Sequence, residues 1–275
     1  MTFIAVCMKW VSGRPEMDPL SGEVRFPSGR FGGVSAADQA ALEVALQLGS
    51  QRSMHVIAIA VGDAKCETAL RDALAVGAQR AIRIDASRSL SSAETAQVLA
   101  LALGDAALIL CGDYSFDRGS GSVPAFLAAE LGISQALGVV SLMTHAEDIT
   151  ATRRLDGGRR EHLRVGDRAV ISVEGSVAQL RRASLTSTLT ARISDIRVIP
   201  SSTTARQVNS TTKPFRPRPR TLDRPVGDTA LERLHSITNV SLSSTRGEQI
   251  ELSATKSATY ILETLARWGY LEQAR

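Results

Sequence analysis

Short apolar runs alternate with amphipathic segments through the first half of the sequence, and this alternation limits the possible folds more than any other feature. Runs rich in Ile, Val and Ala at 3–8 and 54–61 have the length and composition of buried parallel strands. Further strands are expected at 81–84 and 107–111, and helices at 36–48, 64–76, 93–103 and 123–131. This order predicts an α/β fold, in which a doubly wound, mostly parallel sheet is covered by helices on both faces.

The second half of the sequence follows a different pattern. Strands at 150–154 and 161–165 flank an Asp-Gly-Gly turn at 156–158, which predicts a β-hairpin, and one more strand is expected at 169–174. The segment 175–192 is polar and rich in Ser, Thr and Arg, so we expect an exposed loop there.

Proline and arginine are concentrated in the segment 200–228, where they exclude a regular helix or a central strand. A helix is expected at 255–271, with its apolar residues on one face. A chain of 275 residues suits one large domain plus an extension. We therefore predict an α/β domain at 1–199, an extended connector at 200–228, and a C-terminal arm at 229–275 that ends in the helix.

Charge, cysteine usage and hydropathy argue against several classes of protein. The net charge is +4, but the basic residues gather in the connector without an aromatic platform, so a solvated linker is favoured over a nucleic-acid contact. The three cysteines and four histidines are scattered, and no metal site is expected. No apolar run is long enough to span a membrane, and the first residues lack the basic lead of a signal peptide. We therefore expect a soluble, cytoplasmic protein without membrane insertion.

Ligands in a doubly wound sheet bind beyond the carboxyl ends of its strands, where the strand order reverses. The segments 7–9, 60–63 and 112–123 and the helix start at Ser35 are expected to converge there. A Gly-Ser-Gly-Ser run at 119–122 precedes a helix, whose unpaired N–H groups and positive dipole end favour a phosphate. The run also fits an ordinary loop, and no Gly-Lys-Ser/Thr makes it a P-loop.

Catalytic residues are not indicated by the sequence. No Gly-x-Ser-x-Gly elbow occurs, and no Ser, His and acid arrangement can be defended from spacing. Asp113 and Asp117 are candidate general bases, but a loop aspartate more often caps a turn or helix, and we favour that interpretation. Hydrolase chemistry is therefore not indicated.

Taken together, these motifs resemble the beta subunit of electron transfer flavoproteins over most of residues 1–200. The clearest match is the segment 62–78, which is close to a family run ending in R-x-A-L-A-M-G-A. The segments A-V-C-M-K (5–9), A-L-E-V-A-L-Q-L (41–48) and R-L-D-G-G (154–158) match in order and spacing. On these motifs we identify the chain as a divergent member of the family.

The resemblance implies an adenine nucleotide alpha hydrolase-like fold and an electron carrier that is not an enzyme. Such a chain pairs with a larger alpha subunit, which holds most of a shared FAD, and encloses an AMP in its own nucleotide-binding domain. The pair would carry electrons from flavin-dependent dehydrogenases to an acceptor, for example a quinone-linked one. The implied cofactor-binding residues are Cys7, Ser35, Val61, Gly62, Ser115, Asp117, Gly119, Ser120, Gly121, Ser122 and Val123.

Some of these positions depart from the family pattern. Gly121, Ser122 and Val123 stand where the family has Asn, Gln and Thr, and Ser35 stands where it has Asn. Electron-bifurcating relatives hold a second FAD in place of AMP, and Val123 slightly resembles their loops. Between these two ligands we favour AMP.

The segment 180–185 resembles the family's P-R-Y-A-T-L, a loop that anchors a partner dehydrogenase through a leucine. The resemblance therefore assigns docking to Arg181 and Leu185. Because the Pro and Tyr of the pattern are absent, an exposed leucine of no consequence is the alternative. The helix at 255–271 resembles the one that docks on the alpha subunit.

Two other interpretations stay open at this point. A stand-alone adenine-nucleotide-binding protein of the universal stress type would explain the first part of the chain, but not the hairpin, the docking segment or the tail helix. A purely structural subunit with an empty nucleotide site would follow if the segment 121–123 had lost phosphate binding.

Overall fold

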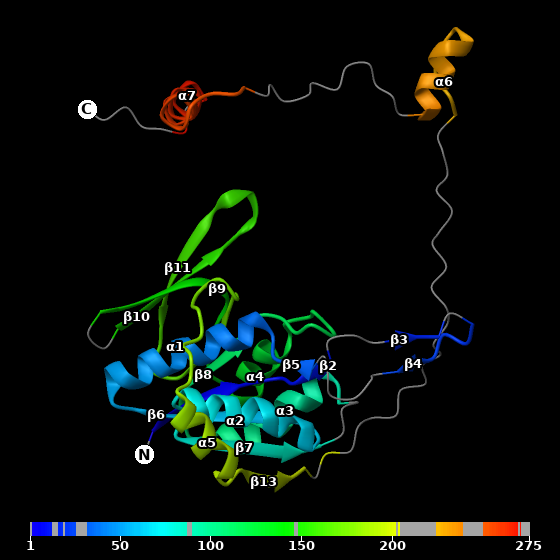
Figure 1. Cartoon of the computed structure of the whole chain (residues 1–275). Coiled ribbons are helices and arrows are strands. Elements are labelled where there is room, and N and C mark those ends of the chain that lie inside the picture. The colour runs from blue at the N-terminus through cyan, green and yellow to red at the C-terminus, as the bar shows by residue number, and fades with distance from the viewer. Residues whose placement is uncertain are drawn as a thin grey trace. The chain divides into compact units, whose positions relative to one another are not determined.

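The computed structural model describes residues 2–12, 16–18, 20–25, 32–86, 90–145, 148–201, 203, 224–238, 250–268 and 270. The chain divides into two compact units, Met1–Phe215 and Arg216–Arg275. Figure 1 shows the first unit as a sheet flanked by helices. The described part of the second unit consists mainly of the helices α6 (Ala230–Thr238) and α7 (Ala254–Arg267).

Among the described residues, nine strands form the main sheet, in the order β11-β10-β9-β12-β8-β1-β6-β7-β13. In chain order the strands are β1 (Phe3–Cys7), β6 (His55–Val61), β7 (Arg80–Asp85), β8 (Ala106–Gly112), β9 (Ser134–His145), β10 (Asp148–Arg154), β11 (Arg160–Val165), β12 (Ala169–Val173) and β13 (Arg197–Pro200). Neighbouring strands are parallel from β9 to β13, whereas β10 is antiparallel to both β9 and β11. The predicted mostly parallel sheet and the predicted hairpin are both confirmed.

The strand order reverses between β1 and β8. From β1 the chain proceeds through β6 and β7 toward one edge of the sheet, and then returns to β8 on the other side of β1. The carboxyl ends of β1 and β8 therefore flank the crevice in which proteins of this topology bind ligands. Along the chain, the segment between β1 and α1 forms two short antiparallel pairs: β2 (Val11–Ser12) with β5 (Gly32–Gly33), and β3 (Glu16–Met17) with β4 (Val24–Arg25).

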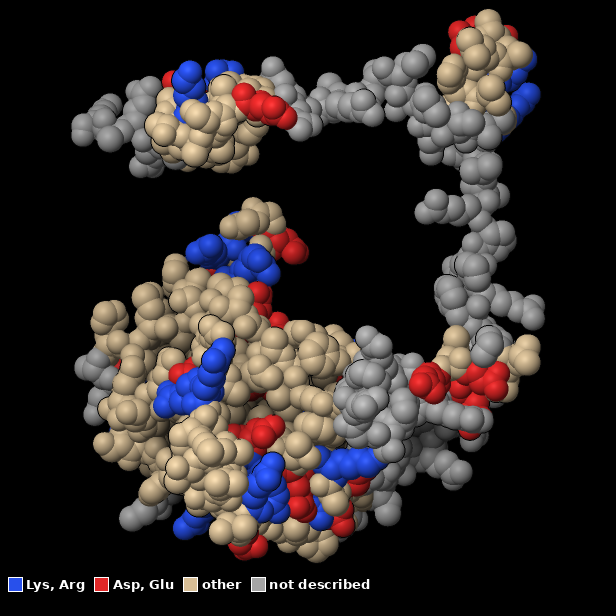
Figure 2. Space-filling model, in the orientation of Figure 1, with Lys and Arg blue, Asp and Glu red and all other residues tan. Residues whose placement is uncertain are grey.

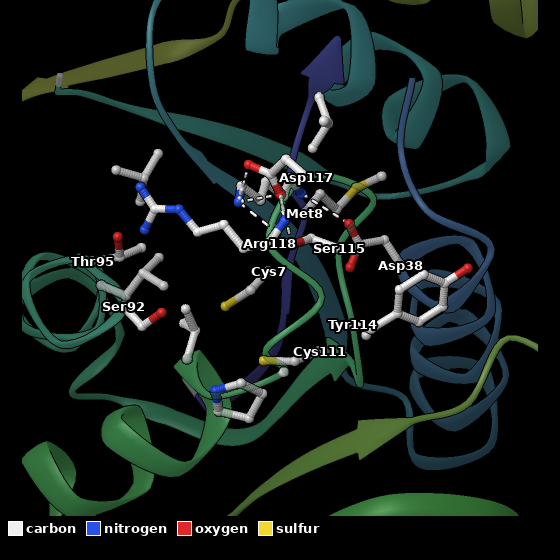
Figure 3. Close-up of a pocket in the computed structure, with 18 of the residues that line it drawn as sticks. Cys7, Met8, Asp38, Ser92, Thr95, Cys111, Tyr114, Ser115, Asp117 and Arg118 are labelled. Carbon is white, nitrogen blue, oxygen red and sulfur yellow. Dashed lines mark hydrogen bonds and ion pairs between the residues drawn. The ribbon is translucent and has the colours of Figure 1, made fainter. Parts of the chain in front are cut away.

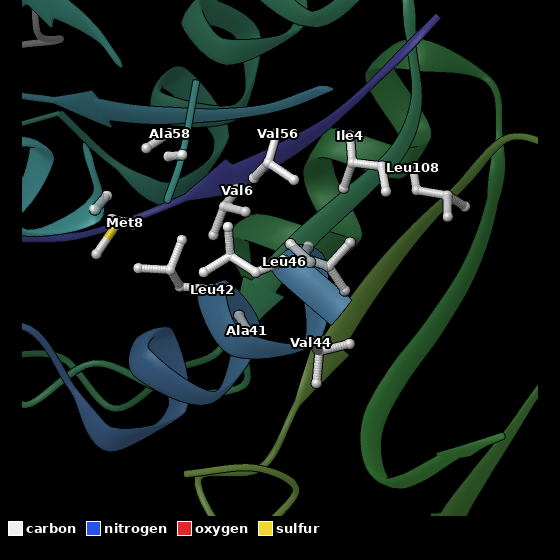
Figure 4. Packing of buried hydrophobic residues seen from close by; sticks show 14 of the residues in the cluster. Ile4, Val6, Met8, Ala41, Leu42, Val44, Leu46, Val56, Ala58 and Leu108 are labelled. Atoms are coloured by element: carbon white, nitrogen blue, oxygen red, sulfur yellow. The ribbon is translucent and has the colours of Figure 1, made fainter. Parts of the chain in front are cut away.

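Helices cover both faces of this sheet (Figure 1). Their bounds are α1 (Ala36–Arg52), α2 (Glu67–Val76), α3 (Ser92–Leu103) and α4 (Val123–Leu131), with a short 3-10 turn, η1 (Ala64–Cys66), before α2. In β1, Ile4 and Val6 join the core layer of α1 and α2, whereas Ala5 between them joins the layer of α3 and α4. This alternation is the period of a strand that is buried on both faces. Figure 4 shows Ile4 and Val6 among the buried side chains of the first layer, with Leu42 of α1.

Local capping explains where the helices begin and end. The Oγ atom of Ser35 accepts the backbone N–H of Asp38 at 3.0 Å and so caps α1, as the sequence predicts. Ser91 and Glu94 form a capping box at the start of α3. Gly77 ends α2 with a φ of 124°, a value that L side chains rarely adopt.

The segment 175–192 is not a continuous loop, and that prediction is wrong. It contains most of α5 (Leu185–Ile193), whose first turn is capped by Ser184 through a 3.0 Å bond from the backbone N–H of Ser187. Ser and Thr have low intrinsic helix propensity, so the pattern favours a loop. Packing of α5 against α2 outweighs that preference.

Two strands of the sheet are not predicted by the pattern. The 12-residue strand β9 begins beside the parallel strand β12 and continues beside the antiparallel strand β10. Gly138, with a φ of 64°, and register shifts in both pairings interrupt its alternation. The strand β13 is short, largely exposed and at the sheet edge, so it lacks the apolar run that marks the central strands.

The connector predicted at 200–228 lies mostly outside the described residues, which resume at 224. The pattern does not predict α6. The helix predicted near the C-terminus is present as α7, but it ends before 271 and exposes an apolar face that includes Ile261, Leu262 and Trp268. Of the helices that the structure describes, none has the length and apolar character needed to cross a membrane.

Candidate functional site

A cavity of about 440 Å³ lies where β1, β6 and β8 end, and its volume is in the range of small-molecule sites. Residues that are distant in the sequence form its wall: Cys7, Met8, Lys9, Trp10, Val11, Asp38, Ile59, Val61, Gly62, Cys66, Leu90, Ser92, Thr95, Leu99, Cys111, Gly112, Tyr114, Ser115, Asp117, Arg118, Ser120, Gly121, Ser122, Val123 and Pro124. Figure 3 shows part of this wall, including Cys7, Asp38, Cys111 and Asp117. The cavity thus lies at the predicted position, the topological switch point of the sheet.

A lysine and an aspartate form the polar centre of this wall. The Nζ atom of Lys9, just beyond β1, lies 2.7 Å from both carboxylate oxygens of Asp117 and 3.5 Å from the Oγ atom of Ser115. Burial alone would raise the pKa of Asp117, but hydrogen bonds from Lys9 and Ser115 outweigh it and hold the pKa below its usual value. Asp117 is therefore a carboxylate that fixes the lysine, which supports the structural interpretation of this residue over that of a general base.

Asp38 joins the ends of the two central strands to α1. Its side chain lines the cavity although the residue is only 6% exposed, and its Oδ2 atom accepts the backbone N–H of Lys9 at 3.0 Å. Burial raises the pKa of Asp38 to about 7, against the opposing effect of backbone hydrogen bonds from Lys9 and Gly112. A Cβ atom on Gly112 would lie 2.5 Å from Oδ1 of Asp38, so glycine is required for this close approach.

The start of α4 supplies the groups that suit an anion. Ser122 precedes α4 and, among the contacts described, does not cap it with its own side chain. N–H groups of the first turn therefore remain for another acceptor, and the dipole of the helix favours a negative charge there. Gly121 has a φ of 55°, and a Cβ atom on it would lie 2.0 Å from the carbonyl oxygen of Asp113. Only glycine fits this backbone approach.

Aromatic and basic side chains complete the wall. Trp10 and Tyr114 offer planar surfaces of the kind that stack on heterocyclic rings. Tyr114 is braced edge-on by Phe116, with ring centroids 5.9 Å apart and an interplanar angle of 84°. The guanidinium of Arg118 donates to the carbonyl of Leu90 at 2.8 Å and so ties the loop before α4 to the segment before α3.

Most of the predicted cofactor-binding residues are brought together in this wall: Cys7, Val61, Gly62, Ser115, Asp117, Ser120, Gly121, Ser122 and Val123. Ser35 lies outside the wall, where it is buried and caps α1. Gly119 also lies outside and shapes the loop, since its N–H donates to the carbonyl of Ser115 at 2.9 Å.

Lys9 and Arg118 lie in segments that were expected to converge here, but the sequence does not single them out as binding residues, and it does not place Asp38 in the site. Asp38 had a detectable signal, because it occupies the third helical position after Ser35, which is the spacing of a capping box. The structure uses that carboxylate for the backbone of Lys9 instead.

The predicted docking residues lie elsewhere on the first unit. Arg181 binds the buried carboxylate of Glu43 on α1 through its Nε and Nη2 atoms, at 2.9 and 2.8 Å. Leu185 is the first residue of α5 and is 76% exposed. With Leu189 and Ile193, which are 52% and 87% exposed, it forms an apolar row at helical spacing, here called the α5 stripe.

The far end of α5 is fixed by Arg71 on α2. Its Nη1 atom lies 2.9–3.1 Å from the carbonyl oxygens of Ala191, Arg192 and Ser194. A cation suits these carbonyls because they form the negative end of the helix dipole. The α5 stripe is therefore presented on a helix that is held at both ends.

Charges elsewhere on the first unit are largely mixed in sign. Figure 2 shows basic and acidic side chains next to each other at the hairpin and on the body below it. At the hairpin, Arg154 pairs with Glu174 at 3.0 Å and Arg164 with Asp148 at 2.8 Å, and Arg153 pairs with Glu161.

Comparison with known proteins matches this sequence to one family. The family model described as "Electron transfer flavoprotein domain" matches residues 28–201. The chain is 29% identical over 158 residues to the electron transfer flavoprotein subunit beta of Bradyrhizobium diazoefficiens, which covers 56% of this chain and 63% of the relative. It is 32% identical over 129 residues to the subunit beta of Bacillus subtilis, covering 45% of this chain and 50% of the relative.

A relative from Arabidopsis thaliana, described as the mitochondrial subunit beta, is 31% identical over 163 residues, covering 57% of this chain and 64% of the relative. The chain thus spans less than two thirds of the length of each of these relatives. Along the chain, the family match includes every element from α1 to β13. It therefore contains the loop before α4 and the α5 stripe. The chain therefore belongs to the electron transfer flavoprotein family, in its beta-subunit branch.

Proposed function

We propose that this chain is the beta subunit of a heterodimeric electron transfer flavoprotein. In this proposal it binds AMP in the cavity at the switch point and helps an alpha subunit to hold FAD. The heterodimer carries electrons from flavin-dependent dehydrogenases to an acceptor such as a quinone-linked oxidoreductase. The chain itself acts as a carrier subunit and not as an enzyme.

The observation that supports nucleotide binding best is the convergence of three kinds of group on one cavity. The first turn of α4 offers backbone donors, Lys9 offers a positive charge, and Trp10 and Tyr114 offer planar surfaces. Backbone donors and a cation suit a phosphate, and planar aromatic surfaces suit a heterocyclic base. The close backbone approach at Gly121 suits a phosphate at the helix start.

Each residue has a defined task in this proposal. The ammonium group of Lys9 donates to the phosphate, and its ion pair with Asp117 keeps it in place. Asp38 holds the backbone of Lys9, so that the lysine enters the cavity from a fixed position. Arg118 and Ser122 line the same mouth of the cavity as α4.

FAD would supply the electron-carrying ring, held mainly by the alpha subunit. We propose that α7 docks on that subunit, because its exposed face includes Tyr260, Ile261, Leu262 and Trp268. A 14-residue helix with such a face is marginal alone and gains stability by burying it. The division into a domain at 1–199, a connector at 200–228 and an arm at 229–275 follows from this role.

We propose that dehydrogenases dock on the α5 stripe, with Leu185 as the anchor. Arg181 would act on docking indirectly, because its guanidinium is engaged by Glu43 and fixes the segment that leads into α5. We also propose a cytoplasmic location, since the thiols of Cys7 and Cys111 are free, as is usual in a reducing compartment.

The decisive experiment is to express the chain with its alpha subunit, denature the purified complex, and identify the released nucleotides by chromatography and mass spectrometry. One FAD and one AMP per heterodimer are expected. Two FAD molecules would replace the AMP proposal by a bifurcating carrier. FAD without a second nucleotide would mean an empty structural site, and a stable chain that binds AMP but no alpha subunit would indicate a stand-alone nucleotide-binding protein.

A further inference from the structure

Two cysteines face each other in the floor of the cavity. Cys7 is the last residue of β1, and Cys111 on the neighbouring strand β8 is its register partner. Register partners on adjacent strands point to the same face of a sheet, and their Cα atoms are about 4.8 Å apart. Both residues line the cavity, and Figure 3 shows both sulfur atoms directed into it.

The separation of these strands suits a covalent link between the two sulfur atoms. Disulfides join residues whose Cα atoms are about 4.4–6.8 Å apart, a range that includes neighbouring strands. The two side chains lie side by side, because the residues are register partners and both line the cavity. Both belong to the core layer of α3 and α4, so no other element separates them.

The two thiols differ in a way that assigns them different tasks. Cys7 is half-buried and open to the cavity, whereas Cys111 is 4% exposed. The hydrogen bond with Cys7 and burial both raise the pKa of Cys111 well above its usual value. Cys111 therefore keeps its proton, and Cys7 is the thiol that an incoming reagent meets first.

We propose that Cys7 and Cys111 form a redox-active dithiol, in which a small hydroperoxide entering the cavity converts the pair into an intramolecular disulfide. The proposal does not depend on which nucleotide the cavity holds. It assigns to this cavity a reversible modification site in addition to a binding site.

The chemistry proceeds in two balanced steps. The thiolate of Cys7 attacks one oxygen of the peroxide, the O–O bond breaks, and the products are a sulfenic acid on Cys7 and, after protonation, an alcohol or water. The sulfur of Cys111 then attacks the sulfur of Cys7, the S–O bond breaks, and the departing hydroxide takes the Cys111 proton as water. Two thiols are oxidised, one peroxide is reduced, and a dithiol reductant reverses the change.

The test uses the purified full chain, alone and in complex with its alpha subunit. The protein is treated with hydrogen peroxide, the excess peroxide is removed, and the protein is unfolded in denaturant so that buried thiols become accessible. The remaining thiols are then blocked with N-ethylmaleimide, and the digest is analysed by mass spectrometry. The expected product is a peptide pair joined through Cys7 and Cys111, which dithiothreitol separates again. Cys66 is the internal reference, because it lines the same cavity but belongs to the other core layer.

Three substitutions sharpen the result. Cys66→Ser should leave the cross-link unchanged, and Cys7→Ser should abolish it. Cys111→Ser should leave a sulfenic acid on Cys7 that dimedone traps, since the second thiol is missing. Because Cys111 is buried and its replacement can affect folding, the decisive result is the cross-linked peptide from the wild-type protein. A wild-type protein in which Cys7 and Cys111 both stay alkylatable after peroxide, or in which the cross-link includes Cys66, would overturn the proposal.

Discussion

The carboxylate of Glu43 is 5% exposed and is bound by Arg181 through its backbone N–H at 3.1 Å and its guanidinium at 2.8 and 2.9 Å. Burial alone would raise the pKa of Glu43, but the hydrogen bonds from Arg181 outweigh it and lower the pKa. The pair therefore stabilises the fold at neutral pH and loses this effect as the pH falls through the lowered pKa. It connects α1 to the segment that leads into α5.

We expect Arg181→Ala to lower the free energy of unfolding by about 2 kcal/mol, because Glu43 would be left buried without its charged partner. Urea unfolding at neutral pH measures this change. Arg182→Ala is the matched control, since the neighbouring Arg182 is exposed and should change stability little. Equal effects of the two substitutions would show that the pair contributes nothing specific.

The raised pKa of Asp38 predicts a pH-dependent stability. The folded protein keeps a proton on Asp38 up to about pH 7, whereas the unfolded chain releases it near the ordinary value of 3.8. Between these values the folded state binds more protons, so stability falls as the pH rises, by at most roughly 4 kcal/mol at about 1.4 kcal/mol per pKa unit.

Asp38→Asn should remove this dependence, so that the variant gains stability relative to the wild type between pH 4 and pH 7. Urea unfolding of both proteins across this range makes the comparison. Asp105→Asn, at an exposed position, is the control. Parallel stability curves for the wild type and Asp38→Asn would contradict the prediction.

Lys9 should contribute directly to nucleotide affinity. Lys9→Ala removes the cation from the cavity and leaves the Asp117 carboxylate unpaired near the phosphate, so AMP affinity should fall by about tenfold or more. Calorimetric titration of nucleotide-free protein with AMP measures the loss. Lys65→Ala, on the exposed surface of η1, should bind AMP as the wild type does. An unchanged affinity of Lys9→Ala would remove this lysine from the site.

Two glycines in one loop separate a steric effect from a conformational one. Gly119 and Gly121 both have positive φ, at 63° and 55°, but only a Cβ atom on Gly121 would collide with a backbone oxygen, at 2.0 Å. Gly119→Ala should cost about 1 kcal/mol for the left-handed backbone alone. Gly121→Ala should cost more and should also displace the start of α4, which lowers AMP affinity.

Thermal unfolding and AMP titration of the two variants test this contrast. Similar losses of stability and affinity in the two variants would mean that the loop can accommodate a Cβ atom at Gly121, contrary to the prediction. The same collision makes Gly121→Asp a poor probe of charge, because its side chain clashes before its carboxylate can repel a phosphate.

The α5 stripe should determine how fast electrons arrive from a dehydrogenase. Leu185→Ala removes an exposed apolar side chain at the start of the helix, and it should slow transfer from the cognate dehydrogenase by about tenfold if Leu185 is an interface anchor. FAD content should not change. Leu189→Ala should have a smaller effect in the same direction, and Thr186→Ala should have none. Wild-type transfer rates in both leucine variants would refute docking on this stripe.

The sequence predicted the central part of this fold because its strands are short, buried on both faces and apolar. β1 and β6 can be predicted from their runs of Ile, Val and Ala. Ser35 and Gly77 mark the start of α1 and the end of α2, because capping depends on local residues. The elements that escaped prediction depend on tertiary contacts. In β9 the environment changes halfway along the strand, and α5 is held by Arg71 and Ser184 despite its Ser and Thr residues.

The candidate site could likewise be predicted only in part from the sequence. The loop before α4 could be recognised from its glycines, because backbone approach to an anion requires them. The individual roles of Lys9 and Asp38 could not be predicted, since a lysine after a strand and an aspartate in a first helical turn are common at solvated positions. The fold brings the end of β1 next to the first turn of α1, and so places these two residues in the wall of one cavity.

The position of β12 has a consequence for how the protein is made. Among the described strands, β12 alone joins the hairpin and β9 to the rest of the sheet, yet it follows all three of them in the chain. A nascent chain leaving the ribosome can complete the wall of the cavity once residues 111–124 have emerged. The edge of β8 stays open until residues 169–173 arrive, and during that interval no strand pairing joins β9 and the hairpin to the growing sheet.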